Sequence, residues 1–277
     1  VCGEGHRHPG VQAAVISSPS PYHVSQAIEL IKAGVHLIVE KPLSHNFQNV
    51  KQLQKLAKKK KVVILVGYVL RHDPAANYFE KLLNSGVTGQ HLHANIECGS
   101  YLPDWRPEQD YRKTVSASKI LGGGVLLELS HELDYAQWFF GSIVSVQAFI
   151  QNSGTLEVDV EDTAQLLLVS NNNVPIFIHL DFNRRHPARC CVVRGTAGEM
   201  NWDVITKEVR WSSAKDGDKT KSFHYDRDEI YQTQLQHFLS CIEQGIQPAV
   251  TLTDGVQTLK IIEAAHKSHL TGKRIYL

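Results

Sequence analysis

The stretch VQAAVISSPSPYHVSQAIELIKAGVHLIVEKPLSHN, residues 11–46, alternates short apolar runs with an amphipathic segment. Its first run, 11–18, leads into a turn with two prolines, which cannot extend a strand. The segment from His23 to Gly34 repeats apolar residues at helical spacing and closes on a glycine suited to a helix end. Residues 35–40, VHLIVE, are rich in branched side chains and predict a second strand.

The same alternation continues to residue 68. Residues 46–61 carry an apolar stripe at helical spacing and end in four lysines, which favour the negative end of a helix dipole. Residues 62–68, VVILVGY, are almost wholly apolar, as expected of a strand buried on both faces. Strand, helix, strand, helix, strand predicts a parallel sheet with right-handed crossovers.

Composition excludes several classes of partner. The chain has 277 residues, is 42% hydrophobic and has 29 basic against 28 acidic residues, so it can bury a large core and offers no charge excess for nucleic acid or an anionic membrane. No apolar run approaches the ~20 residues of a membrane helix. Its five cysteines are odd in number and lack CxxC spacing, which indicates a reducing, cytoplasmic location.

The second half of the chain has a different pattern. It predicts a mainly antiparallel sheet, with one helix over 125–141 and two helices after Asp228 covering one face, an α+β arrangement. A boundary near Asp73 is expected because Pro74 disfavours helix in the residue before it, which gives domains 1–72 and 73–277. The predicted strands are 91–102, 142–152, 162–170, 174–183 and 189–202.

Three segments follow the carboxyl ends of the parallel strands, where such sheets bind ligands. They are SSPSPYH (17–23), EKP (40–42) and YVLRH (68–72). Glu40 and Lys41 are therefore expected at a functional site, with Pro42 holding the backbone in either the trans or the cis form. The alternative is that the two charges are only the solvated end of a strand.

Four blocks, 13–44, 66–90, 122–141 and 231–277, together resemble the Gfo/Idh/MocA family of NAD(P)-dependent oxidoreductases, which includes glucose–fructose oxidoreductase and inositol dehydrogenases. The resemblance implies a Rossmann-type dinucleotide-binding domain, NAD or NADP as cofactor, and a sugar, sugar nucleotide or cyclitol as substrate. It also implies a set of cofactor-binding residues: Ser18, Pro19, His23, Glu40, Lys41, Pro42 and Arg71.

The family's G-x-G-x-x-G loop is not found in this sequence. The nearest candidate is GEGHRHPG, residues 3–10, where His8 stands in place of the third glycine and no strand precedes it. Backbone N–H groups of that loop hold the cofactor pyrophosphate in this fold. The expectation is that about two βαβ units are missing, and that this stretch of chain by itself binds a dinucleotide weakly.

Oxidation of a secondary alcohol needs a base for the hydroxyl proton and a positive group beside the developing alkoxide. His131 and Lys41 match the family's catalytic histidine and lysine, and both are also expected to contact substrate. Glu128 and Asp134, three residues to either side of His131, are the candidates to orient its ring. The family's carboxylate stands four residues before the histidine, where this chain has Leu127. Without the resemblance, a packed or capping histidine is the alternative.

Two further loop segments carry residues that can bind ligands. Trp105 and Arg106, in the loop 101–112, are candidates to stack on a sugar and bind an anion, and a surface loop packed on its own aromatic residues is equally favoured. Glycines 122–124 lack P-loop spacing and predict a loop that leads into the catalytic helix. The HxH pairs lack further ligands at zinc spacing, so no metal site is predicted.

Three functions remain open at this point: a sugar or cyclitol dehydrogenase, a glycosidase that recycles bound NAD, and a non-catalytic binding or assembly relative. The strands at 162–170 and 174–182 are more apolar than a one-sided sheet requires. A homodimer or homotetramer built on the open face of the sheet is therefore expected.

Overall fold

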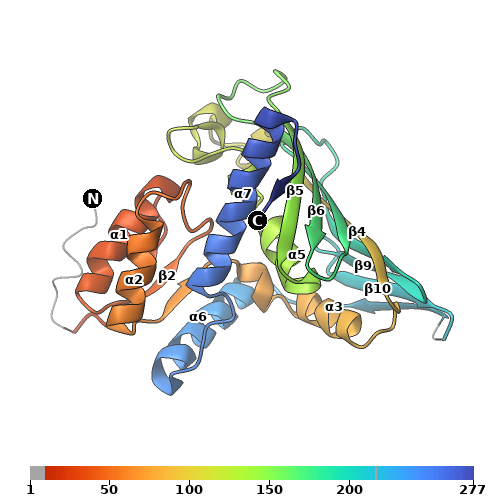
Figure 1. Cartoon of the computed structure of the whole chain (residues 1–277), viewed down its shortest axis with the longest axis horizontal. Coiled ribbons are helices and arrows are strands. Elements are labelled where there is room, and N and C mark those ends of the chain that lie inside the picture. The colour runs from red at the N-terminus through yellow and green to blue at the C-terminus, as the bar shows by residue number, and fades with distance from the viewer. Residues whose placement is uncertain (1–9, 216) are drawn as a thin grey trace.

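The computed structural model describes residues 10–215 and 217–277, so nearly all of the GEGHRHPG segment lies outside the described residues. Figure 1 shows two sheets with helices between them and beside them. The first is a three-stranded parallel sheet in the order β1-β2-β3. Its strands are β1 (Ala13–Ile16), β2 (His36–Val39) and β3 (Ile64–Val66).

The crossovers of this sheet are α1 (Ser20–Lys32) and α2 (Val50–Lys60), so the predicted alternation of strands and helices is confirmed. α1 ends as expected, with Gly34 in the left-handed region at φ +82°. α2 begins later than predicted because Asn49 has a left-handed backbone (φ 59°), which no helix can include.

A short 3₁₀ helix, η2 (Val69–His72), leads from β3 to α3 (Pro74–Asn84). Between them Asp73 is extended, with ψ 125°, and its carboxylate accepts hydrogen bonds from the backbone N–H groups of Ala75 and Ala76 at 2.7 and 3.0 Å. As predicted, the residue before Pro74 stays out of the helix. α3 begins at Pro74, and Asp73 is its N-cap.

The second sheet has nine strands in the order β11-β10-β9-β8-β4-β7-β6-β5-β12. It is antiparallel except that β4 and β7 run parallel. Its strands are β4 (His91–Gly99), β5 (Ile143–Gln151), β6 (Thr163–Ser170), β7 (Pro175–Asp181), β8 (Ala188–Gly195), β9 (Gly198–Asp203), β10 (Glu208–Ser213), β11 (Gly217–Ser222) and β12 (Ile275–Tyr276).

Sequence patterns missed part of this sheet. The predicted strand 189–202 is two strands, β8 and β9, joined by a turn. The β10–β11 hairpin was not predicted because β11, GDKTKS, has no apolar residue and is exposed along its whole length. A charged edge strand of this kind avoids pairing with other chains, and it carries no hydrophobic signal.

The prediction of one helix over 125–141 is wrong. The structure has α4 (Val125–Glu128) and α5 (His131–Phe140), separated at Leu129, whose backbone (φ −98°, ψ 32°) leaves the helical region. In a continuous helix the Glu128 carbonyl would accept from the N–H of Glu132, which instead bonds Leu129 at 3.4 Å. The break therefore frees the carbonyl of Glu128 for another partner.

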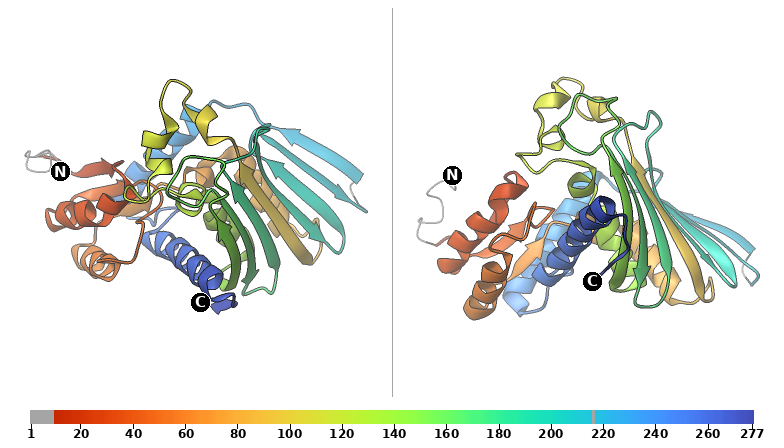
Figure 2. Two further views of the ribbon diagram at one scale, coloured as in Figure 1. Left: turned by 90° about the horizontal axis from the view of Figure 1, so that it is seen from above. Right: turned by 45° about the horizontal axis from the view of Figure 1, so that its top comes forward.

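The helices cover one face of the large sheet, as predicted. Figure 2 shows α3, α5 and the last helix, α7 (Leu252–Thr271), on the same side, with no helix of the described chain on the other side. The main core lies between this face and its helices. On the open face Phe149 and Phe177 are 57% and 47% exposed.

The closing helices also serve the small sheet. α6 (Arg227–Gln244) places Phe238 against Ile38 and Leu65, and the segment before α7 bonds β3 through Val66 N–H and the Val250 carbonyl at 3.2 Å. The connection between β4 and α4 holds three short 3₁₀ helices: η3 (Leu102–Trp105), η4 (Tyr111–Lys113) and η5 (Val115–Ala117).

Candidate active site

A buried histidine ties together the loops after β1 and β2. His23 places Nδ1 2.9 Å from the carbonyl oxygen of Pro42 and Nε2 2.5 Å from that of Ser18. Burial is the largest influence on this ring and lowers its pKa. The Ser18 hydroxyl donates a hydrogen bond to Oε1 of Gln26 at 2.7 Å. The polar side chains of His23 and Ser18 are therefore both used in holding the loops. Main-chain atoms of the two predicted loops are thus brought to one place.

Glu40 and Lys41 follow β2 directly, as the strand pattern predicted. A Cβ on Gly67 would lie 3.0 Å from Glu40 Oε2, so the glycine after β3 leaves just enough room for this carboxylate. Burial raises the pKa of Glu40 above its ordinary value. The Lys41–Pro42 peptide bond is cis, one of the two forms left open by the sequence.

Lys41 reaches from the small sheet to the helix break. Its Nζ donates to the carbonyl oxygen of Glu128 at 2.9 Å and lies 3.6 Å from the Glu128 carboxylate. The side chains of Lys41 and Glu128 are only 20% and 19% exposed. Residues 87 positions apart in the sequence therefore meet in a half-buried ion pair.

His131 is the first residue of α5 and faces Tyr68. Their rings meet edge to face with centroids 5.4 Å apart. The Nδ1 atom of His131 is shielded from solvent and has no hydrogen-bond partner among the described residues. Burial, and then the positive charges of Arg189, Lys41 and Arg227, hold the pKa of His131 well below its ordinary value. The ring is therefore neutral at pH 7 and is able to accept a proton.

Asp134 and Arg71 are engaged with each other. Nε and Nη2 of Arg71 each donate to the Asp134 carboxylate at 2.8 Å, and the guanidinium lies over the ring of Trp138 at 5.5 Å. The expected position of Asp134 on one helix face with Glu128 is wrong, because the helix breaks between them. The contacts place Asp134 on Arg71 instead of on the ring of His131. They also give Arg71 a structural partner, and its expected cofactor contact stays a prediction.

A second buried carboxylate, which the sequence patterns did not reveal, lies beside His131. Glu132 has no exposed side-chain surface, and it accepts hydrogen bonds from Nε and Nη2 of Arg189 at 2.8 and 3.3 Å. Arg189 comes from the start of β8, 57 residues away. The only local signal was a charged residue directly after His131 in a segment that is mostly apolar.

The glycines at 122–124 pack closely on their surroundings, and Gly122 packs against the first part of the chain. A Cβ on Gly122 would overlap the hydroxyl oxygen of Ser20, at the start of α1, and one on Gly123 would overlap the carbonyl oxygen of Val115. The Ser20 hydroxyl is buried and has no hydrogen-bond partner among the described residues. An unsatisfied donor beside the two loops fits a site that a polar cofactor group completes.

Trp105 and Arg106 lie in the loop after β4. Trp105 donates its indole N–H to the Ser100 hydroxyl at 2.6 Å and packs edge to face on Phe182 with ring centroids 5.3 Å apart. Its 36% exposure leaves part of the ring open to solvent, and Arg106 is exposed. These contacts are those of the predicted alternative, a loop packed on aromatic residues.

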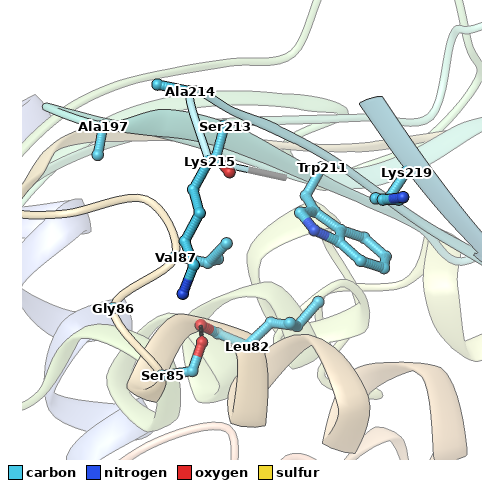
Figure 3. Close-up of a pocket in the computed structure, with 10 residues that line it drawn as sticks. All are labelled: Leu82, Ser85, Gly86, Val87, Ala197, Trp211, Ser213, Ala214, Lys215 and Lys219. Atoms are coloured by element: carbon cyan, nitrogen blue, oxygen red, sulfur yellow. Dashed lines mark hydrogen bonds between the residues drawn. The ribbon is translucent and has the colours of Figure 1, made fainter. Parts of the chain in front are cut away.

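A cavity of about 570 Å³ lies elsewhere, between the end of α3 and the β10–β11 hairpin (Figure 3). Trp211 and Leu82 face each other across it, and Lys215 and Lys219 also line it, with the Lys215 side chain extending toward Ser85. Among the residues that the structure describes, those that line it include no carboxylate or imidazole that could take a proton from an alcohol. The cluster around Lys41 and His131 is therefore the better candidate for chemistry.

Within the described ranges 10–215 and 217–277, no three His, Cys, Asp or Glu side chains gather in a way that could hold a metal ion. In the same part of the chain, no helix combines the length and the apolar character needed to cross a membrane.

A small parallel sheet whose loops carry Lys41 to the helix break near His131, beside a large open-faced sheet, has the architecture of a Rossmann-type part joined to an antiparallel sheet. Residues 4–68 match the model of the oxidoreductase family with an NAD-binding Rossmann fold, and residues 77–201 match the GFO/IDH/MocA C-terminal domain. The chain belongs to the Gfo/Idh/MocA family of oxidoreductases, which confirms the predicted family and fold class.

The chain is 31% identical to an uncharacterized oxidoreductase of Synechocystis sp. over 62% of its own length and 49% of that relative. It is 26% identical to scyllo-inositol 2-dehydrogenase (NAD(+)) of Bacillus subtilis over 97% of this chain and 78% of the relative. Levoglucosan dehydrogenase in complex with NADH and levoglucosan has the same fold, with a TM-score of 0.90, 20% identity and coverage of 98% of this chain and 82% of that one.

Proposed function

We propose that the chain carries the catalytic centre of an NAD(P)-dependent dehydrogenase that moves a hydride between the nicotinamide and a secondary alcohol of a sugar, sugar nucleotide or cyclitol. The observation that carries this proposal is the meeting of Lys41 with Glu128 beside the neutral ring of His131. The named activities of relatives, on inositol and on levoglucosan, support the substrate class.

In this proposal His131 is the general base. Its ring is neutral, so it accepts the proton of the substrate hydroxyl while the hydride leaves the same carbon. Lys41 has three N–H donors, of which one is used by the Glu128 carbonyl, so the ammonium group can donate to the oxygen that gains negative charge. The Glu128 carboxylate, 3.6 Å away, attracts the ammonium group and helps to hold it in place.

The bound nicotinamide supplies the hydride acceptor. The residues proposed to hold it are the loop backbones of Ser18–Pro19 and of Glu40–Pro42, which His23 ties together, and the Ser20 hydroxyl. The choice between NAD and NADP stays open. Arg71 is left out of this set because Asp134 holds it and only 10% of its side chain is exposed.

The test is Lys41→Ala, with turnover followed by NADH formation from a panel of sugars and cyclitols. We expect a fall in turnover of at least about 100-fold, equivalent to ~3 kcal/mol of transition-state stabilisation. Lys207→Ala is the matched control, because Lys207 also binds a carbonyl oxygen, that of Tyr225, away from the cluster. Near wild-type turnover in Lys41→Ala would remove the lysine from the mechanism. Sugar release without net NADH would identify the glycosidase instead.

We also propose a homodimer or homotetramer built on the open face of the large sheet, in the cytoplasm. Supporting this, Phe149 and Phe177 are exposed there, and Leu167 lies directly opposite Phe177 in the β6–β7 register. Exposed aromatic residues on an uncovered sheet face favour association with a second copy.

The proposed division of the chain falls at Asp73, between a dinucleotide-binding part (1–72) and a substrate-binding part (73–277). Asp73 lies between η2 and α3 and is buried, with 2% of its surface exposed. α6 and α7 belong to the second part in sequence, yet they pack on the small sheet and so help to complete the first core.

A further inference from the structure

α4, the turn that ends at Glu128, is too short to be stable by itself. It has four residues, whereas isolated helices need roughly 12–15 residues to persist in water. The N–H groups of its first residues also have no partner within the helix. Its last carbonyl group, that of Glu128, nevertheless accepts the 2.9 Å hydrogen bond from Lys41. Contacts that fix the start of α4 therefore also fix the acceptor for this lysine.

Glu161 supplies such contacts at the start of α4. Its backbone carbonyl oxygen accepts from the N–H of Val125 at 3.0 Å, and its Oε1 atom accepts from the N–H of Leu126 at 3.3 Å. A Cβ on Gly124 would lie 2.5 Å from Oε1, so this glycine lets the carboxylate approach the main chain. Burial is the largest influence on the Glu161 carboxyl group and raises its pKa. In the described part of the chain Glu161 forms no ion pair, and its carboxylate serves backbone N–H groups.

Glu161 is itself fixed to the large sheet. It stands directly before Asp162 and β6, and the carbonyl oxygen of Asp162 accepts from the N–H of Phe182 at 2.9 Å. Asp162 is fully buried, and its carboxylate accepts from the N–H and hydroxyl groups of Ser153 at 3.0 and 2.5 Å. The position of Glu161 is therefore set by contacts other than those with α4.

These hydrogen bonds connect the large sheet with Lys41. Glu161 bonds the first turn of α4, and the Glu128 carbonyl at its end accepts from Lys41. The alternative is that packing alone places α4, because Val125 and Leu126 have no exposed surface. Packing acts on side chains, however, whereas the acceptor for Lys41 is a main-chain group. The hydrogen bonds of Glu161 act on the main chain directly.

We propose that Glu161 is a positioning residue for the dehydrogenase: by holding the start of α4, it sets the Glu128 carbonyl where it keeps Lys41 in reach of the substrate oxygen. The role needs the length of the side chain and an oxygen acceptor, and it does not need a negative charge. This assignment rests on the proposed function. It adds to the site a residue 35 positions from the N–H group that it binds.

The first test measures Lys41 directly and does not depend on activity. Acetylation of each lysine by acetic anhydride is followed over time by peptide mass spectrometry. Weakening of the hydrogen bond to the Glu128 carbonyl should make Lys41 react about threefold or more faster in Glu161→Ala than in the parent.

This measurement has two controls. Lys207 is the internal reference, because it also donates to a carbonyl oxygen, that of Tyr225, and its rate should not change. Asp159→Asn is the control variant. Asp159 lies in the same loop as Glu161 and accepts from the N–H of Lys119 at 2.8 Å, outside α4, so its replacement should leave the rate of Lys41 unchanged.

The second test separates reach from charge by steady-state kinetics. Glu161→Gln keeps the length and the acceptor oxygen, and it should retain most of the turnover. Glu161→Asp keeps the charge on an arm that is shorter by one methylene, and its kcat should fall about tenfold or more, as in Glu161→Ala. The dissociation constant of NADH should stay within about twofold of the parent value. In the Lys41→Ala background, Glu161→Ala should change turnover by less than about twofold, because it acts through the lysine.

The outcomes separate this assignment from the proposed function. Equal acetylation of Lys41 in Glu161→Ala and the parent would overturn the assignment. Full kcat in folded Glu161→Asp, or a loss in Glu161→Ala that is equally large with and without Lys41, would overturn it as well. Faster acetylation with unchanged turnover in both Glu161→Ala and Lys41→Ala would keep the hold on Lys41 and remove the lysine from the proposed mechanism. Glu161→Asp replaces Glu161→Ala in both tests if the alanine variant does not fold.

Discussion

Replacement of Arg71 by leucine should lower the free energy of unfolding, because Arg71 forms a buried ion pair with Asp134 that joins the two parts of the chain. The Arg71 guanidinium donates twice to Asp134, and the two side chains are only 10% and 2% exposed. Arg71→Leu would leave the Asp134 carboxylate buried without its partner. Removing one member of a buried pair costs about 3–5 kcal/mol, because the remaining charge is not compensated.

Urea unfolding, followed by tryptophan fluorescence, measures this loss as a change in the free energy of unfolding. The double variant Arg71→Leu, Asp134→Leu removes both charges and should recover most of the stability, which gives a large coupling energy in the double-mutant cycle. Arg112→Leu is the control, since Arg112 pairs with Asp110 at 49% exposure and its loss should cost no more than about 1 kcal/mol.

Two results would contradict the reasoning. A loss below about 1 kcal/mol for Arg71→Leu, or a coupling energy near zero, would show that solvent compensates Asp134. NADH affinity gives the second readout. If the ion pair is the whole role of Arg71, the folded double variant binds NADH as the parent does, whereas a large loss of affinity would restore the cofactor contact expected from the sequence.

Three further predictions concern pH, the glycine loop and assembly. Unfolded histidines bind protons below about pH 6.5, but in the folded chain burial lowers the pKa of His23, His36, His45, His72, His91, His131 and His266. Stability should therefore be greatest above this pH and fall below it, and equal urea midpoints at about pH 7.5 and 5.5 would contradict this. Gly123→Ala should destabilise the chain by about 1–3 kcal/mol, because the new methyl group overlaps main-chain carbonyl oxygens of Val115 and Ser116, which cannot rotate away; an unchanged melting temperature would show that the loop yields. Phe149→Glu with Phe177→Glu should convert the oligomer to a monomer in light scattering, and a monomeric mass for the parent at micromolar concentration would count against the proposed interface.

The sequence by itself determined the features that depend on local patterns. The alternation of apolar runs and amphipathic segments determined β1 to β3 with their helices, because the periods of strands and helices differ. It also predicted that Glu40 and Lys41 lie at the loop edge of the small sheet, since the carboxyl ends of parallel strands share one edge of a sheet. The helix containing His131 was predicted in position, although its break was not.

Tertiary structure decided which charged groups meet. Asp134 lies three residues from His131, yet its partner is Arg71, 63 positions away, and the partner of Glu132 is Arg189, 57 positions away. A carboxylate looks the same in a local pattern whether it orients a base, holds a cation or faces water. Its role depends on which donor the fold brings within about 3 Å and how far both are removed from solvent. The helix break after Glu128 likewise depends on a distant residue. The carbonyl group that the break frees accepts a hydrogen bond from Lys41, 87 positions earlier in the chain.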